Sequence, residues 1–172
     1  EASLARLQQG HVDILQLHNT LEARDDRGFL TVEQVLNEVV PAFMKLRDEG
    51  KTSYLGFTAK GDTDALHKVI ESGDFDSAQI FYNMLTPSAG EAIPDGYPAQ
   101  DYRQLLTAAA RHGVGAIGVR VLAGGTLSGR LARHPLGLQN VAPIGSGPDY
   151  ATDVKRALRF KPLLAAGYAA NL

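Results

Sequence analysis

Short apolar runs alternate with amphipathic segments along the whole chain. The amphipathic segments have helical spacing, and the first, Ala2–Leu7, has the pattern of the last turns of a helix. The apolar runs predict four strands, at Val12–Leu17, Ser53–Thr58, Ser77–Tyr82 and Gly115–Val121. Strands that alternate with helices indicate a parallel sheet and the α/β class. Both an open doubly wound sheet and part of a closed barrel fit this order. We expect the first strand to be buried.

Local signals predict where the helices begin and end. Thr31 is an expected N-cap, and Gln34 stands at the capping-box spacing. Pro41 removes a backbone donor, so it should divide the following helix into two pieces, which end at Gly50. Other expected segments are a helix capped by Asp62 or Thr63, helices at Tyr102–Arg111 and Tyr150–Leu164, and connections at Leu21–Gly28 and Arg133–Pro148.

Composition and charge exclude several classes of protein. The 172 residues contain no cysteine, so disulfides, thiolate metal sites and a cysteine nucleophile are excluded. Seventeen basic and 19 acidic side chains give a net charge of −2, which offers no electrostatic basis for binding nucleic acid or an anionic membrane. There is no apolar run of the ~20 residues that span a bilayer, and the first residues do not resemble a signal peptide. We therefore expect a cytoplasmic protein.

Polar residues follow each predicted strand, at the edge where parallel α/β proteins place their sites. His18 follows the first strand, and it is either a catalytic group or a hydrogen-bonded core histidine. Gln79 lies in an apolar strand and needs a partner, which could be backbone. Arg120 could form a structural ion pair or contact an anion. The histidine spacings do not suggest a metal site, and the nucleotide-binding glycine motifs of Rossmann and P-loop proteins are absent.

Four stretches, in this order, resemble consecutive strands of the aldo-keto reductase family: Val12–Asn19, Gly50–Phe57, Asp76–Asn83 and Gly113–Gly129. The last resembles the seventh strand and the loop that covers the cofactor pyrophosphate. The resemblance implies an oxidoreductase with a (β/α)8 TIM barrel. Such an enzyme transfers a hydride from NADP(H) to an aldehyde or ketone, with NAD(H) as the alternative cofactor. A complete barrel typically has ~250 residues, so residues 1–172 are expected to form one partial barrel domain that covers strands four to seven.

The family's functional residues carry over position by position. His18 matches the histidine that orients the substrate carbonyl and assists proton transfer. Gln79 matches the ligand of the nicotinamide carboxamide, and Thr58 stands where the family usually has a serine. The candidate cofactor-binding residues are Thr58, Gln79, Val119, Arg120, Leu122 and Gly124, and the candidate substrate pocket contains Asn19, Tyr82 and Asn83. No metal is expected.

The sequence also departs from the family pattern. Ala59 stands where an asparagine is usual, Val119 where many members have an aromatic ring, and Arg120 where a serine is usual. Arg120 could pair with the pyrophosphate. The family's catalytic tetrad is Asp, Tyr, Lys and His, and the first three belong to earlier strands, so this chain supplies His18 alone and should be inactive by itself.

Three hypotheses follow from the resemblance. The chain is a piece of an NADP-dependent oxidoreductase, a non-catalytic cofactor-binding or regulatory relative, or a half-barrel that assembles with another chain. The expected partner is a small carbonyl compound. Unpaired sheet edges would favour homo-oligomers.

Overall fold

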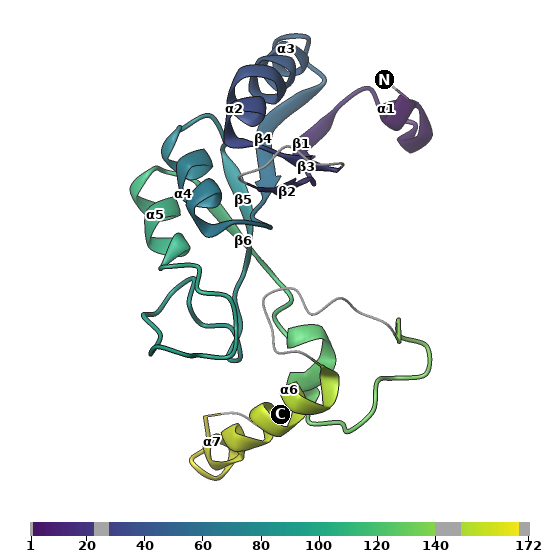
Figure 1. Cartoon of the computed structure of the whole chain (residues 1–172). Coiled ribbons are helices and arrows are strands. Elements are labelled where there is room, and N and C mark those ends of the chain that lie inside the picture. Colours follow the sequence, from purple (N-terminus) through teal and green to yellow (C-terminus); the bar gives the residue numbers. More distant parts are fainter. Residues whose placement is uncertain (1, 23–27, 140–148, 169–172) are drawn as a thin grey trace. The chain divides into compact units, whose positions relative to one another are not determined.

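The computed structural model describes residues 2–22, 28–139 and 149–168. Its main sheet has four strands in the order β1-β4-β5-β6, which are Val12–Leu17, Thr52–Thr58, Ser77–Phe81 and Gly115–Val119 (Figure 1). β1 pairs with β4, and β4 with β5, in parallel. All four predicted strands are therefore confirmed, with ends that move by two residues at most. The predicted connections Leu21–Gly28 and Arg133–Pro148 lie partly outside the described residues.

The chain folds as two compact units. The first contains residues 1–80 and 105–117, and the second contains residues 81–104 and 118–172. Besides β1 and β4, the first unit contains a short two-stranded sheet and most of the helices. Its further elements are α1 (Ala2–Leu7), β2 (Thr20–Leu21), β3 (Phe29–Leu30), α2 (Val32–Gln34), a π-helix (Val35–Val39), α3 (Val40–Asp48), α4 (Thr63–Glu71) and α5 (Leu105–Arg111).

The predicted helix ends of the first unit are largely confirmed. Thr31 and Gln34 form the reciprocal capping box: Gln34 N donates to Thr31 Oγ1 at 3.2 Å, and Thr31 N donates to Gln34 Oε1 at 2.9 Å. Pro41 stands in the first turn of α3, directly after the π-helix. The preceding residue, Val40, closes the π-helix by donating its backbone N–H to the Val35 carbonyl, and proline is tolerated in the first turn of a helix because it lacks only a donor that has little use there. Asp62 caps α4 by accepting a hydrogen bond from Ala65 N at 3.0 Å.

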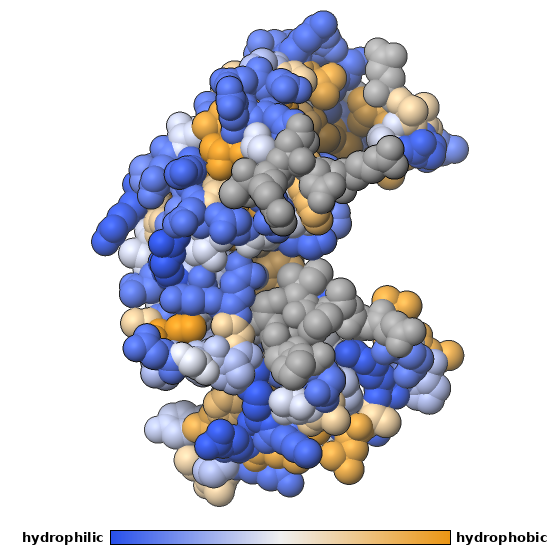
Figure 2. All heavy atoms as spheres, in the orientation of Figure 1, coloured by the Kyte–Doolittle hydropathy of each residue, from blue (hydrophilic) through white to orange (hydrophobic). Residues whose placement is uncertain are grey.

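The core of the first unit lies between the sheet and its helices. Leu66, Val69 and Ile70 of α4 are fully buried, as are Leu55 and Phe57 of β4. The outer surface of α2, α3 and α4 is largely hydrophilic in Figure 2, the distribution that amphipathic helices produce when their apolar sides face a core.

The first strand, β1, differs from the prediction that it is buried. Most of its side chains are at least partly accessible, and Ile14 is 39% exposed. β1 stands at one end of the described strand order and pairs with β4 alone within it, so one side of it lacks a covering strand.

The second unit contains shorter helical segments. These are a 3₁₀ segment (Ala123–Ser128), α6 (Tyr150–Ala157), a 3₁₀ turn (Leu158–Phe160) and α7 (Lys161–Ala165). The predicted single helix Tyr150–Leu164 is thus three pieces, and Pro162 stands in the first turn of the third.

The predicted helix Tyr102–Arg111 begins three residues late, at Leu105. Arg103 and Gln104 have left-handed φ values of 47° and 57°, which are incompatible with a right-handed helix. Gln104 N instead donates to the carbonyl of Ser88 at 2.8 Å. A non-local hydrogen bond therefore decides this boundary.

Candidate active site

Three candidate site residues stand in one row across adjacent strands: His18 directly follows β1, Thr58 ends β4, and Gln79 lies in the middle of β5. Leu17 pairs with Phe57, so the next positions, His18 and Thr58, are neighbours, and Thr58 pairs with Gln79. Thr58 Oγ1 donates a 2.9 Å hydrogen bond to Gln79 Oε1. The partner that Gln79 needs is therefore a side chain. Thr58 is 5% exposed, whereas the His18 side chain is exposed among the described residues and Asn19 is half-buried.

A second polar row lies one layer beneath the first, two residues back along each strand. It consists of Gln16, Gly56 and Ser77, which are paired in register. A Cβ at Gly56 would lie 2.6 Å from Ser77 Oγ and 3.0 Å from Gln16 Nε2, so a side chain at this position would require Ser77 to move. Among the described residues, Gln16 Oε1 and Ser77 Oγ have no hydrogen-bond partner. The glycine inside a strand was the sequence signal for this close approach.

The loops that follow β1 and β4 are joined by their backbones. Leu21 N donates to the Lys60 carbonyl at 2.8 Å, and Asp62 N donates to the Leu21 carbonyl at 2.8 Å. The Leu21 side chain is fully buried. Gly61, with φ of +122°, lies so close that a Cβ there would overlap the Leu21 carbonyl oxygen. This Leu21–Gly61 clamp fixes the segment that begins with His18 against the segment that begins with Thr58.

In the second unit, Asn83 and Arg120 are in direct contact. Asn83 Nδ2 donates to the Arg120 carbonyl at 3.1 Å, while Asn83 Oδ1 accepts from Leu85 N at 2.9 Å and Thr86 N at 3.0 Å. Arg120 has a left-handed φ of 54°, and its Cζ lies 5.9 Å from the centre of the Phe81 ring.

Electrostatics near Arg120 reflect burial and a second cation. The pKa of Arg120 is lowered, first by burial and then by the charge of Arg133, while Tyr102 acts in the opposite direction. Burial also raises the pKa of Tyr102 to about 12, despite the opposing effect of Arg120. The guanidinium groups of Arg120 and Arg133 repel each other, and Arg120 is partly buried. An anionic ligand would relieve this repulsion.

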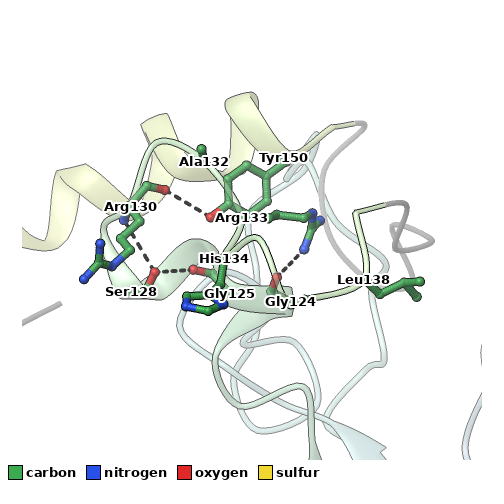
Figure 3. Close-up of a pocket in the computed structure, with 10 residues that line it drawn as sticks. Gly124, Gly125, Ser128, Arg130, Ala132, Arg133, His134, Leu138 and Tyr150 are labelled. Atoms are coloured by element: carbon green, nitrogen blue, oxygen red, sulfur yellow. Dashed lines mark hydrogen bonds between the residues drawn. The ribbon is translucent and has the colours of Figure 1, made fainter.

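A cavity of about 370 Å³ lies beside the glycine-rich turn, where Gly124 and Gly125 have φ values of 65° and 100° (Figure 3). Arg133 donates to the Gly124 carbonyl, and its Cζ lies 4.3 Å from the centre of the Tyr150 ring. Tyr150 OH donates to the Arg130 carbonyl at 3.0 Å. The lining includes three basic side chains, Arg130, Arg133 and His134. The sequence analysis did not name these three residues as candidates, although basic residues directly after a glycine-rich turn could have indicated an anion-binding site.

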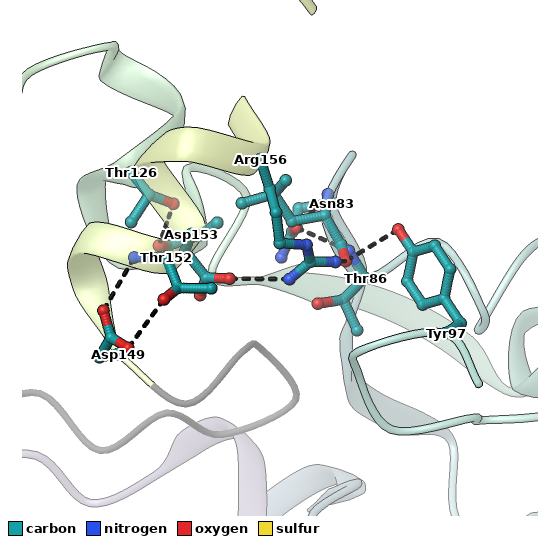
Figure 4. Close-up of polar contacts among 10 residues, drawn as sticks. Asn83, Thr86, Tyr97, Thr126, Asp149, Thr152, Asp153 and Arg156 are labelled. Carbon is teal, nitrogen blue, oxygen red and sulfur yellow. Dashed lines mark hydrogen bonds and ion pairs between the residues drawn. The ribbon is translucent and has the colours of Figure 1, made fainter. Parts of the chain in front are cut away.

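A buried ion pair connects α6 to the turn after Asn83 (Figure 4). Arg156 Nη1 lies 2.7 Å from Asp153 Oδ1, and Arg156 Nη2 donates to the Leu85 carbonyl at 2.7 Å. Tyr97 OH donates to the same carbonyl at 3.2 Å, and the Arg156 guanidinium lies over the Tyr97 ring. Asp153 is only 4% exposed, so this pair is a structural connection within the second unit.

The candidate residues therefore fall into two sets. His18, Asn19, Thr58 and Gln79 belong to the first unit, and Tyr82, Asn83, Val119, Arg120, Leu122 and Gly124 belong to the second. Tyr82 is 39% exposed and Leu122 is 60% exposed, while Val119 is half-buried. Within the described ranges, no group of three or more potential metal ligands occurs, and no helix is long and apolar enough to cross a membrane.

Comparisons with known proteins agree with the resemblance. L-galactose dehydrogenase from Arabidopsis thaliana is 41% identical over 58 residues, which are 34% of this chain and 16% of that protein. A solved structure, the holo form of an aldo-keto reductase from Bacillus halodurans, has a TM-score of 0.54 at 21% identity, and the match covers 78% of this chain and 37% of that one. The chain thus spans well under half the length of either protein. The structural match shows a TIM-barrel-like fold, with a sheet that is not closed in the described residues. The model of the aldo/keto reductase family matches residues 1–137, and the chain belongs to that family.

Proposed function

We propose that the full-length protein is an oxidoreductase that reduces an aldehyde or ketone with NADP(H). Membership of the aldo/keto reductase family supports oxidoreductase activity in general. The observation that carries the finer proposal is the row of His18, Thr58 and Gln79 across three adjacent strands, in which Thr58 ends β4 and Gln79 lies in the middle of β5. This row brings an exposed imidazole beside an amide that can hold a carboxamide ligand and a hydroxyl that contacts this amide.

The residues of this row have separate roles. Gln79, hydrogen-bonded to Thr58, would hold the carboxamide of the nicotinamide, and the nicotinamide when bound would supply the hydride. The exposed His18 imidazole orients the carbonyl oxygen of the substrate and assists proton transfer. The assignment of Asn19, Tyr82 and Asn83 to the substrate pocket stays a prediction from the family resemblance.

The basic cavity of the second unit offers groups that suit a diphosphate. Left-handed Gly124 and Gly125 turn the backbone beside Arg133, Arg130 adds a second guanidinium group, and the His134 side chain also lines the cavity of about 370 Å³. Arginine guanidinium groups bind phosphate oxygens through paired, charge-assisted hydrogen bonds. Arg120 belongs to the same electropositive region. Its pKa is lowered first by its own burial and then by the charge of Arg133.

A cofactor titration tests this proposal. The expected result is that full-length protein enhances NADPH fluorescence, that NADH binds more weakly, and that Arg133→Met weakens NADPH binding about tenfold, as expected for one charge-assisted contact. Arg159→Met is a matched control, because Arg159 is an exposed arginine of the same unit outside the cavity. Equal effects of the two substitutions would contradict the diphosphate site, and tighter binding of NADH would contradict the assignment of NADP(H).

Catalysis requires groups that these 172 residues do not supply. By the family resemblance, the proton-donating tyrosine and its Asp and Lys partners belong to earlier strands, and the members of such a tetrad act as a unit. The 172-residue chain alone should therefore show no carbonyl-dependent oxidation of NADPH, and measurable turnover by it would contradict these roles. The name of the Arabidopsis relative makes L-galactose a first compound to assay with the full-length protein in the oxidising direction.

Location and assembly are part of the same proposal. We expect a cytoplasmic protein, and we expect the 172-residue chain to associate through its sheet. β1 stands at one end of the described strand order, so it presents an edge to which another strand could add, and the paired residues Ile14 and Tyr54 are 39% and 55% exposed beside it. Light scattering tests this expectation, and a monodisperse monomer would count against it.

A further inference from the structure

The contact between Thr58 and Gln79 restricts what each can offer to a ligand. A threonine hydroxyl has one hydrogen to donate. Thr58 is only 5% exposed, and it donates this hydrogen to Gln79 Oε1 at 2.9 Å. The two backbones are also joined, because Ala59 N donates to the Gln79 carbonyl at 2.8 Å. Thr58 therefore has no hydrogen left to donate to a ligand, and at 5% exposure its oxygen has little access to one.

The same contact sets the orientation of the Gln79 amide. With its oxygen held by Thr58, the amide presents its nitrogen, which carries two hydrogen-bond donors. The neighbouring Ala59 has no polar side chain, so amide recognition on this row falls to Gln79. Beneath the row, Gln16 and Ser77 lie on the two strand positions that flank Gly56.

We propose that Thr58 is a positioning residue that acts through Gln79 and does not itself bind the cofactor. It fixes the amide so that Gln79 Nε2 faces the ligand, and the ligand group at this position is a hydrogen-bond acceptor, such as the carbonyl oxygen of a nicotinamide carboxamide. This inference rests on the proposed function, and it changes the role of Thr58 from ligand to support.

A double-mutant cycle in the full-length protein distinguishes the two roles. The dissociation constant of NADPH is measured by fluorescence for Thr58→Val, Gln79→Ala and the double variant. Thr58→Val keeps the shape and removes the hydroxyl, so it should weaken binding about fivefold, the ratio for one neutral hydrogen bond. In the Gln79→Ala background, the same substitution should change the dissociation constant by less than about twofold, because the group through which Thr58 acts is gone.

Two further variants separate positioning from general stability. Thr58→Ser restores the hydroxyl and should recover most of the affinity. Thr52→Val is the matched control, because Thr52 is 3% exposed at the opposite end of the same strand and donates to the Tyr54 carbonyl at 3.1 Å. It should lower the free energy of unfolding about as much as Thr58→Val, without changing NADPH affinity.

The outcomes separate this inference from the function on which it rests. A fivefold effect of Thr58→Val that persists without Gln79 would show a direct contact and overturn the positioning role. The positioning role would also be overturned if Thr58→Ser failed to restore affinity. Failure of the unaltered protein to bind NADPH and NADH would overturn the proposed function, and this inference with it.

Discussion

Gly61→Ala tests whether the Leu21–Gly61 clamp holds the two loops that carry His18 and Thr58. A Cβ at Gly61 would overlap the Leu21 carbonyl oxygen and lie 2.7 Å from its carbon and 2.8 Å from the Leu21 nitrogen. All three atoms are backbone, so no rotation of a side chain can relieve the overlap. The two loops must separate.

The expected cost follows from the contacts that would be lost. Separation breaks two hydrogen bonds of 2.8 Å, from Leu21 N to Lys60 O and from Asp62 N to Leu21 O, each worth about 1 kcal/mol net. Alanine at φ of +122° adds strain of about 1 kcal/mol. Together these terms lower the free energy of unfolding by about 3 kcal/mol.

Gly73→Ala is the matched control for backbone strain. Gly73 has φ of +74°, and nothing lies within 4 Å of the position that a Cβ would take there. This substitution therefore introduces left-handed strain of about 1 kcal/mol alone, with no overlap.

Urea denaturation of the full-length protein measures the difference, which should be about 2 kcal/mol between the two variants. Amide hydrogen exchange adds a local measurement, since Leu21 and Asp62 should lose protection in Gly61→Ala and retain it in Gly73→Ala. Equal unfolding free energies together with unchanged protection would refute the clamp.

Three further predictions concern single residues. His18→Ala in the full-length protein should lower carbonyl turnover and leave NADPH affinity nearly unchanged, and unaltered turnover would remove His18 from the mechanism. Burial raises the pKa of Tyr102 from 10.0 to about 12. Between these pH values the unfolded chain loses a proton that the folded chain keeps, so the unfolding free energy should fall by about 3 kcal/mol as pH rises; urea titrations should show this slope, and Tyr102→Phe should abolish it. Thr31→Ala should lower the unfolding free energy by about 1 kcal/mol through loss of the capping box, whereas Thr107→Ala, inside α5, removes no cap and should cost less in the same urea titration.

Features determined by neighbouring residues were predictable from the sequence. The Thr31 capping box, the Asp62 cap and the position of Pro41 each depend on residues within four positions. The strand positions were equally clear, because short apolar runs that alternate with helices in an α/β chain usually form the strands of its sheet. The proximity of His18 and Thr58 followed from these strand ends, since parallel strands in register bring their ends to one edge. Gln79 joins them from the middle of β5, a register that the strand pattern alone does not specify.

Features determined by distant residues were not predictable in the same way. The late start of α5 depends on Ser88, whose carbonyl accepts from Gln104 N, far along the chain. The close approach of Gly61 to Leu21 depends on how two loops meet, and nothing in either loop alone indicates it. The exposure of β1 depends on which strands flank it, which the pattern of β1 cannot specify.

Asn83 illustrates how a residue chosen for a substrate pocket can have a structural use as well. Its side-chain oxygen accepts from two backbone nitrogens, and its nitrogen donates to the Arg120 carbonyl. An asparagine engaged in this way shapes the turn at Leu85 and Thr86 and stabilises the left-handed backbone at Arg120, a conformation that costs a non-glycine residue about 1–2 kcal/mol. Arg120, which follows β6, is therefore supported by Asn83, which follows β5. The two positions should be interpreted together, because a substitution at Asn83 removes a hydrogen bond that holds the Arg120 backbone and so shifts the position of the Arg120 side chain.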